Sequence, residues 1–489
     1  MDFLDPKKRK AHVRRLYIGY VLVAIAIGLG ALVLLFASFG YGVDRQGTVF
    51  QNGLVFLAST PDAAQVKISN ADKSFEETVV TSDRLELKAD TYNFQYLKQG
   101  YKPWQNSFDI KGGSIERLVY PFLVPETLKT NVDESYPAAP GLVTQSPDRR
   151  TILVQQPASL TAFQVFDSND LAKAPTTFTL PVSLLPAGAA VKPFQLVEWS
   201  TNNRHVLVRY DADSGPIFLM IDRDNPAESR NLNTYFGLAP TKLALRDKDP
   251  KRFYMILPDK RLVTAEIDNK VVRDEAPSVL DFKSHGDDNI LYVSDAGAAE
   301  PGKVRAVVRQ NNKDYLVREL PTSATYVLDL AQYSNRWYVV VGGSTANEAY
   351  IYRDPVLALQ STNNSTPTIR TVRLDHPTRV SFSATSRFIA VQSGSNFAVY
   401  DSEKDRQHKF TVNPNFDDPA AVHWMDGHRL MGSTEGKVLI IDFDGTNQQT
   451  LNPIVAGTQP MFDDNFEQLN TLAPATAGQS LTSTSMLVQ

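Results

Sequence analysis

Residues 146–154 read SPDRRTILV, a polar turn with two arginines followed by a short β-rich run. The same shape recurs along the rest of the chain: a polar turn, a basic or bulky residue, then a short apolar run. Eight copies are found, at 146–154, 200–208, 249–256, 286–293, 334–341, 384–391, 426–431 and 463–466. Their mean spacing of about 45 residues is typical of the blades of a β-propeller. One blade cannot bury both of its faces alone, so residues 130–489 are expected to pack blades around an axis.

A second apolar run follows several copies and ends in aspartate, at Asp167, Asp222, Asp401 and Asp442. Eight copies predict eight blades, or seven if the first and last copies contribute to one blade. An elongated array of β-sandwiches is the competing architecture. The polar end, residues 473–489, would be either a frayed tail or a closing strand.

The turn at residues 146–150 resembles the strand-linking turn of WD-like and Tol-periplasmic-type propellers. This resemblance concerns the fold and carries no activity with it.

A smaller β module is predicted between residues 52 and 125. Apolar and polar residues alternate in 65–68, 85–88 and 92–96, which is typical of strands with one buried face. We expect Gly100 to adopt a turn conformation, and Tyr101 and Trp104 to plug one end of the core. A binding role is the alternative for Trp104.

Residues 59–68, reading STPDAAQVKI, resemble the opening of a PEGA domain, and residues 87–94 with Gly100-Tyr101 resemble its second half. The chain departs from the pattern at Ala63 and Asp90, where the family prefers glycine, and it lacks the family's middle Gly-x-Thr-Pro element. The resemblance implies a small, surface-exposed β-sandwich of cell-envelope proteins, with no catalytic activity.

A membrane anchor is predicted at residues 16–43, which contain no charged residue. About 20 helical residues span the roughly 30 Å hydrocarbon core. Residues 44–51 would be a linker. A cleaved signal peptide is the alternative, but this apolar run is longer than such peptides carry, and residues 36–39 (FASF) match a cleavage site poorly.

Charge predicts the orientation of the anchor. The arm of residues 1–15 has six basic and two acidic residues, so its net charge is +4 and residues 44–489 carry −8 of the total −4. The positive-inside rule places the arm in the cytoplasm and the C-terminal part outside the cell membrane, as a single-pass signal anchor. An acidic ectodomain argues against nucleic acid as a partner. The chain has no cysteine, which excludes disulfides and Cys-ligated metals and suits a bacterial protein.

The sequence contains no Gly-x-Ser-x-Gly elbow, no His-Glu-x-x-His helix and no phosphate loop. His423 and His428 lack an assignable third metal ligand. Residues 442–445 (DFDG) resemble a fragment of a calcium loop without its terminal glutamate, so a turn is expected. Residues 432–436 are expected to form a hairpin turn, and residues 363–366 a loop. We therefore assign no catalytic, cofactor-binding or metal-binding residue, and no cofactor.

Two functions remain open. The first is a membrane-anchored cell-envelope scaffold without enzymatic activity, in which the propeller face binds a protein or glycan. The second is a polysaccharide hydrolase or lyase whose catalytic carboxylates, His or Tyr are scattered in sequence around the channel. Inward-facing Asp, Glu, His or Arg would favour the enzyme, whereas an apolar or aromatic patch on the propeller face would favour binding.

Overall fold

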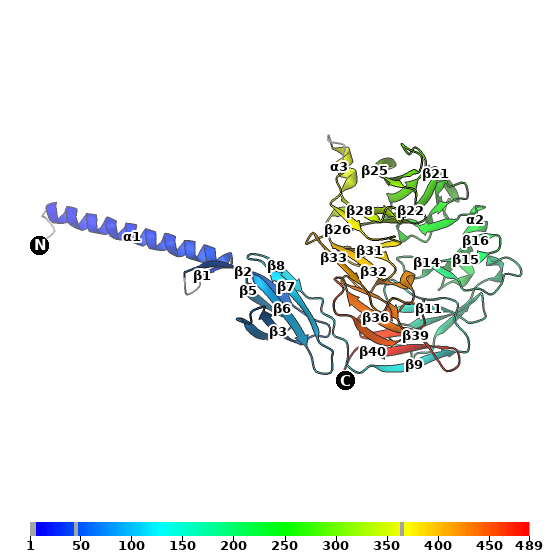
Figure 1. The fold of residues 1–489 in the computed structure, drawn as a ribbon, viewed down its shortest axis with the longest axis horizontal. Coiled ribbons are helices and arrows are strands. Elements are labelled where there is room, and N and C mark those ends of the chain that lie inside the picture. Colours follow the sequence, from blue (N-terminus) through cyan, green and yellow to red (C-terminus); the bar gives the residue numbers. More distant parts are fainter. Residues whose placement is uncertain (1–5, 44–46, 362–365, 489) are drawn as a thin grey trace. The chain divides into compact units, whose positions relative to one another are not determined.

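The computed structural model describes residues 6–43, 47–361 and 366–488. The chain forms two compact units that divide between residues 127 and 128. We call them unit 1 and unit 2 (Figure 1). The loop expected at residues 363–366 lies almost wholly outside the described residues.

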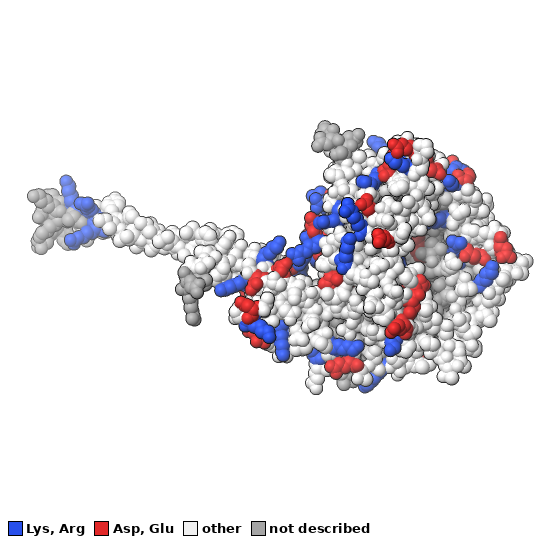
Figure 2. All heavy atoms as spheres, viewed as in Figure 1, with Lys and Arg blue, Asp and Glu red and all other residues white. Residues whose placement is uncertain are grey.

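Unit 1 begins with helix α1 (Pro6–Ser38). The most apolar 18 residues of its stretch His12–Ser38 have a mean hydropathy of 2.7, and none of them is buried. Figure 2 shows the basic arm at the start of this helix and an uncharged surface along the rest of its visible face. By length and composition the helix can cross a membrane, and a signal sequence would pass the same test.

The helix ends earlier than the predicted span of residues 16–43. Gly40 turns the chain at φ +76°, and Tyr41–Val43 forms strand β1, which pairs with β2 (Val49–Leu57). The linker expected at 44–51 therefore overlaps β2, while residues 44–46 lie outside the described residues. Apolar composition alone does not distinguish helix from strand, and here cross-strand hydrogen bonding decides the boundary.

Two four-stranded sheets complete unit 1 and share one hydrophobic core. One sheet consists of β4 (Glu76–Val80), β3 (Gln65–Asn70), β6 (Asp90–Leu97) and β7 (Trp104–Ile110). The other consists of β1, β2 and β5 (Asp83–Lys88), with β8 (Ile115–Leu118) parallel to β2.

The aromatic plug of this core is as predicted. Trp104 is buried between Tyr96 and Tyr120, with ring centroids 5.2 and 5.7 Å away in edge-to-face geometry. Tyr101 is also buried, and Gly100 adopts a positive φ of +80°. Trp104 therefore packs in the core and is not placed to bind a ligand.

Unit 2 is a β-propeller built, within the described residues, from eight four-stranded antiparallel sheets. We number these blades along the chain. Blades 1 to 4 are β10 (Val143–Gln145), β11 (Thr151–Gln155), β12 (Ala162–Asp167) and β13 (Thr176–Thr179); β14 (Gln195–Trp199), β15 (His205–Ala212), β16 (Gly215–Asp222) and β17 (Arg230–Asn231); β18 (Lys242–Leu245), β19 (Arg252–Ile256), β20 (Leu262–Glu266) and β21 (Val271–Ala276); and β22 (Val279–His285), β23 (Asn289–Ser294), β24 (Lys303–Gln310) and β25 (Lys313–Pro321).

Blades 5 to 8 follow the same order. A short helix, α2 (Leu232–Phe236), lies between blades 2 and 3, and a second, α3 (Pro355–Gln360), lies between the third and fourth strands of blade 5. Their strands are β26 (Tyr326–Tyr333), β27 (Arg336–Gly343), β28 (Glu348–Arg353) and β29 (Arg370–Arg373); β30 (Arg379–Phe382), β31 (Phe388–Ser393), β32 (Asn396–Asp401) and β33 (Arg406–Thr411); β34 (His423–Trp424), β35 (Arg429–Thr434), β36 (Lys437–Asp442) and β37 (Gln449–Pro453); and β38 (Met461–Phe462), β39 (Gln468–Pro474), β40 (Gln479–Ser485) and β9 (Lys129–Tyr136).

The repeated polar turn joins the first and second strands of a blade. In three copies a serine amide donates to the carbonyl five residues later, over 2.9 to 3.0 Å: from Ser146, Ser200 and Ser383. The fourth residue of each of these turns has a positive φ, close to 60°: Arg149, Asn203 and Ser386. In these three copies the sequence repeat is therefore a repeat of one backbone turn.

Blade 8 closes the ring. Its outer strand is β9, which precedes blade 1 in sequence and pairs antiparallel with β40 (Figure 1, cyan beside red). Ile152 and Phe166 of blade 1 share a hydrophobic cluster with Leu472 and Leu481 of blade 8. The C-terminal residues thus supply a closing strand. The first and last copies of the repeat lie in separate blades, so the described residues form eight blades and not seven. The pairing of β9 with β40 excludes an open array of sandwiches.

Candidate functional site

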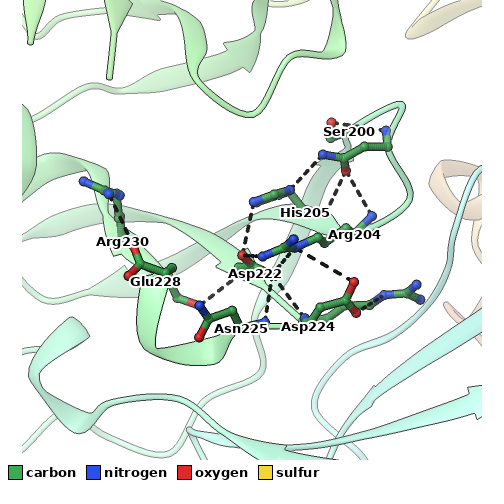
Figure 3. A network of polar contacts seen from close by, with 11 residues as sticks. Ser200, Arg204, His205, Asp222, Asp224, Asn225, Glu228 and Arg230 are labelled. Carbon is green, nitrogen blue, oxygen red and sulfur yellow. Dashed lines mark hydrogen bonds and ion pairs between the residues drawn. The ribbon is translucent and has the colours of Figure 1, made fainter. Parts of the chain in front are cut away.

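A network of charged and polar side chains surrounds Asp222 in blade 2 (Figure 3). Arg204, just before β15, donates from Nε to Oδ1 of Asp222 at 2.6 Å and makes a second contact to Oδ2. The amides of Asp224 and Asn225 donate to the same Oδ1 at 3.1 and 3.0 Å. Burial opposes ionisation, but these hydrogen bonds hold the pKa of Asp222 below its ordinary value.

The network places a histidine near the Asp222 carboxylate, an arrangement that also occurs in catalytic His–Asp pairs. His205 Nε2 lies 3.5 Å from Asp222 Oδ2, and its Nδ1 lies 2.9 Å from Asn202 Nδ2. The nearby hydroxyl of Ser200 instead donates to the carbonyl of Lys248 at 2.7 Å. The arrangement therefore lacks a hydroxyl hydrogen-bonded to the histidine, which a nucleophile–base pair requires.

The same ion pair recurs in other blades, which identifies its role as structural. Arg387 donates to Asp401 at 3.0 and 2.7 Å, Arg336 to Asp354 at 3.0 Å, and Arg429 Nε lies 3.5 Å from Asp442 Oδ1. In each case the arginine is at or beside the start of the second strand, and the aspartate is at or just after the end of the third. We call these pairs blade clamps.

The DFDG stretch at residues 442–445 is a turn, as predicted. The Gly445 amide donates to the Asp442 carbonyl at 2.9 Å, and Asn447 donates to Asp442 Oδ2 at 2.9 Å. The Asp442 carboxylate thus serves its blade clamp. Residues 432–436 likewise end in the expected hairpin, because Thr434 pairs with Lys437 across Glu435-Gly436.

The two histidines at 423 and 428 lie in different surroundings. His423 is on the innermost strand of blade 7, where its Nδ1 lies 3.0 Å from the carbonyl of Ala421. The His428 ring packs edge-on against Phe388, 5.5 Å away, and against Phe443. Burial lowers the pKa of both, to about 4 for His423. Among the described residues no group of three metal-ligating side chains occurs.

A second set of polar groups lies on the innermost strands, around the propeller axis. These side chains bond to the neighbouring blade. Gln145 donates to the carbonyl of Phe462 at 2.8 Å, Lys242 to that of Phe282 at 3.1 Å, and Arg379 to that of Val422 at 2.6 Å. Two tryptophan indoles do the same: Trp199 donates to Thr144 Oγ1 at 3.0 Å and Trp424 to Ser381 Oγ at 3.1 Å. We call these contacts inner latches.

Asp329 on β26 is the most perturbed carboxylate among these inner groups. It is half-buried, and burial raises its pKa to about 6. Backbone amides of Leu330 and, in the next blade, Phe382 hydrogen-bond to it, and the cations Lys283 and Arg379 favour its charged form. A carboxyl that titrates near pH 6 can exchange a proton near neutrality, so Asp329 is our candidate functional residue.

Asp329 and the inner latches were not predicted from the sequence. A usable signal exists: one charged residue interrupts an apolar run just before the polar turn, as in VLDLA at 327–331 and LVEW at 196–199. From the sequence alone this signal does not show that the strand is innermost, because that position depends on the order of strands within the blade.

Comparisons with known proteins give the fold and no closer relationship. No family model and no curated protein matches the chain. The β-propeller domain of Myceliophteria thermophila Cps50 (Swd1) matches at 11% identity and TM-score 0.40, over 65% of this chain and 97% of that one. BamB from Moraxella catarrhalis matches at 9% identity and TM-score 0.43, over 73% and 100%. Porphyromonas gingivalis dipeptidyl peptidase 4 matches at 14% identity and TM-score 0.46, over 72% of this chain and 58% of that one.

These matches concern the fold alone. The chain is mostly β, with one N-terminal apolar helix and a β-propeller.

Proposed function

We propose that this chain is a membrane-anchored scaffold whose propeller presents a binding face to a protein or a glycan. The main observation in support is the unburied apolar stretch His12–Ser38, which follows a basic arm and precedes two β units in the sequence. This stretch has 27 residues, more than the roughly 20 that a bilayer requires, and its most apolar 18 residues have a mean hydropathy of 2.7.

The orientation follows from charge. Six basic residues lie within residues 1–15, before the uncharged run that begins at residue 16, and residues 44–489 are acidic. Under the positive-inside rule the arm is cytoplasmic, and both β units lie outside the cell membrane, in the cell envelope. Unit 1 would act as a PEGA-like spacer that holds the propeller away from the bilayer.

Binding is favoured over catalysis because the polar groups that stand out in unit 2 already have structural partners. Blade clamps such as Arg387–Asp401 pair two opposite charges within one blade. Inner latches such as Arg379 donate hydrogen bonds to backbone carbonyls of the next blade. A partner would meet the propeller face, and the acidic balance of the chain disfavours nucleic acid.

Protease accessibility on intact cells tests the anchor and its orientation. The full chain carries one tag at each end, in a host whose outer envelope can be permeabilised. We expect protease to remove the C-terminal tag, while the N-terminal tag stays in the membrane fraction. A C-terminal tag that remains protected even after permeabilisation would overturn the proposal.

The alternative, a polysaccharide hydrolase or lyase, rests on Asp329. Its pKa of about 6 suits a general acid or base, but the charged neighbours that shift this pKa are Lys283 and Arg379, both cations. Hydrolysis usually needs a second carboxylate. If the chain degrades envelope polysaccharide, Asp329→Asn should lower the rate by at least about 100-fold, as loss of a general acid–base group does. Equal rates for the natural chain and Asp329→Asn would show that Asp329 is not a catalytic acid or base.

A further inference from the structure

Strands β1 and β2 present apolar side chains on one face, directly after α1 ends. Their antiparallel register pairs Tyr41 with Gln51 and Val43 with Val49. Side chains of directly paired residues, and of residues two apart, share one face of a sheet. Tyr41, Val43 and Val49 therefore lie together, with Val43 66% exposed and Val49 62% exposed.

The opposite face of the same two strands is occupied by protein. Phe50 is paired with Gly42, and its ring lies so close that a Cβ on Gly42 would come within 2.5 Å of it. The Lys88 ammonium lies 4.2 Å from the centre of the Phe50 ring. The hairpin thus has one covered side and one exposed apolar side.

The exposed side is tied to the end of the helix. The Asn52 amide donates to the Gly40 carbonyl at 2.8 Å, and Gln51 Nε2 donates to the Phe39 carbonyl at 3.1 Å. The ring of Phe36, in the last turns of α1, lies edge-on to Tyr41 with centroids 5.4 Å apart. No flexible spacer separates the apolar helix from the apolar strand face.

We propose that Phe39, Tyr41, Val43 and Val49 lie in the interfacial layer of the lipid bilayer, so that the first strand pair of unit 1 rests on the membrane. We call these four residues the interfacial patch. This inference rests on the proposed insertion of α1.

Three features favour lipid as the occupant. The patch continues the apolar surface of α1, which is itself unburied through Ser38. It contains a tyrosine, a residue type enriched where bilayer and water meet. Finally, the β1–β2 pairing provides hydrogen-bond partners for backbone N–H and C=O groups of both strands, which would otherwise enter the bilayer interface without partners.

Single cysteines test the patch, because the natural chain has none. Full-length Val43→Cys, Val49→Cys, Leu29→Cys and Val80→Cys are labelled with the fluorophore NBD and reconstituted in phosphatidylcholine vesicles. The vesicles contain lipids that are spin-labelled either near the headgroup or deep in the acyl chain. Val80 is the matched control, since it is a valine on a strand of unit 1, is 54% exposed and lies outside the patch.

We expect the deep quencher to act on the label at position 29. The shallow quencher should act on labels at 43 and 49 at least about twofold more strongly than on the label at 80, with a blue-shifted emission, because interfacial groups sit at headgroup depth. Two positions are used so that one poorly folding variant does not decide the result.

The outcomes separate the inference from the proposed function. If label 29 is quenched but labels 43 and 49 behave like label 80, the patch is not interfacial, although the anchor stands. If label 29 is not quenched by either lipid, the anchor itself fails. Blue-shifted emission at 43 and 49 without lipid quenching would mean that protein, such as a second copy, covers the patch, which also overturns the inference.

Discussion

Arg387 and Arg336 occupy equivalent places in blades 6 and 5 but differ in solvent access. The Arg387 side chain is 19% exposed and pairs with Asp401, which is almost fully buried, whereas the Arg336 side chain is 59% exposed. An ion pair on the surface contributes little, because water screens both charges. Removing one partner of a buried pair lowers stability strongly, since it leaves the other, desolvated charge without a partner.

We therefore expect Arg387→Ala to destabilise the protein by about 2 kcal/mol, and the matched variant Arg336→Ala by less than about 1 kcal/mol. Thermal unfolding of the full chain, followed by circular dichroism, measures both. Equal losses for the two variants would mean that burial does not govern the blade clamps.

His423 should make the protein sensitive to acid. In the unfolded chain a histidine takes up a proton near pH 6.5, whereas burial lowers the pKa of His423 to about 4. The stability it contributes is thus complete above pH 6.5 and is lost as the pH falls toward 4, by up to about 3 kcal/mol.

The variant His423→Gln should therefore lose less stability than the natural chain between pH 7 and pH 4.5. The exposed His376 provides the control variant, His376→Asn. Melting temperatures across this range give the comparison, and parallel pH profiles for the natural chain and His423→Gln would contradict the assignment.

At the scale of elements, the closing blade differs from the others in what fills it. Its strands β39 and β40 bury hydroxyl and amide side chains, among them Asn470, Thr471, Thr482 and Thr484. Hydroxyls meet across the strands, as Thr471 and Thr482 do at 2.9 Å and Thr130 and Thr484 do at 2.9 Å. Directional hydrogen bonds therefore replace part of the aliphatic packing in this blade. Because such bonds require defined distances and angles, the pairing of β39, β40 and β9 depends on the backbone geometry of these strands.

Gly478, just before β40, is the backbone position most sensitive to change in this blade. Its φ is +86°, and an added Cβ would overlap the carbonyl oxygen of Tyr136 on β9. Gly478→Ala should destabilise the protein by more than about 2 kcal/mol, through strain and through displacement of β9.

Gly188 is the matched control, since its φ is +72° but no atom lies within 4 Å of an added Cβ. Gly188→Ala should cost only about 1 kcal/mol, the strain of the left-handed conformation. If both variants melt at the same temperature, the approach of β9 to Gly478 is not close in solution.

At the scale of the whole molecule, ring closure makes unit 2 different from an open repeat array. In an open array, removing the last repeat weakens only its neighbour. Here β40 lies between β39 and β9, so the two ends of the propeller meet through it.

A chain truncated after residue 478 lacks β40. We expect it to lose protease resistance throughout unit 2, whereas deletion of residues 2–11 at the other end should leave unit 2 resistant. Limited proteolysis with mass spectrometry locates the cuts. Blades 2 to 5 remaining intact in the shortened chain would contradict the dependence on closure.

The sequence by itself determined the elements that depend on neighbours along the chain. The 45-residue repeat, the polar turns and the apolar helix are local patterns, since strand alternation, turn residues and hydropathy act over a few residues. The core position of Trp104 could be predicted for the same reason, because it lies in a strand beside a glycine turn.

Only the tertiary structure decided the features that join distant segments. It placed β9 in blade 8, ended α1 at Ser38, paired the turn arginines with the strand-end aspartates, and assembled Asp329 with Lys283 and Arg379. Each depends on which strands become neighbours around the axis. That choice is made by burial and hydrogen bonding summed over the closed ring, and no single stretch of residues encodes it.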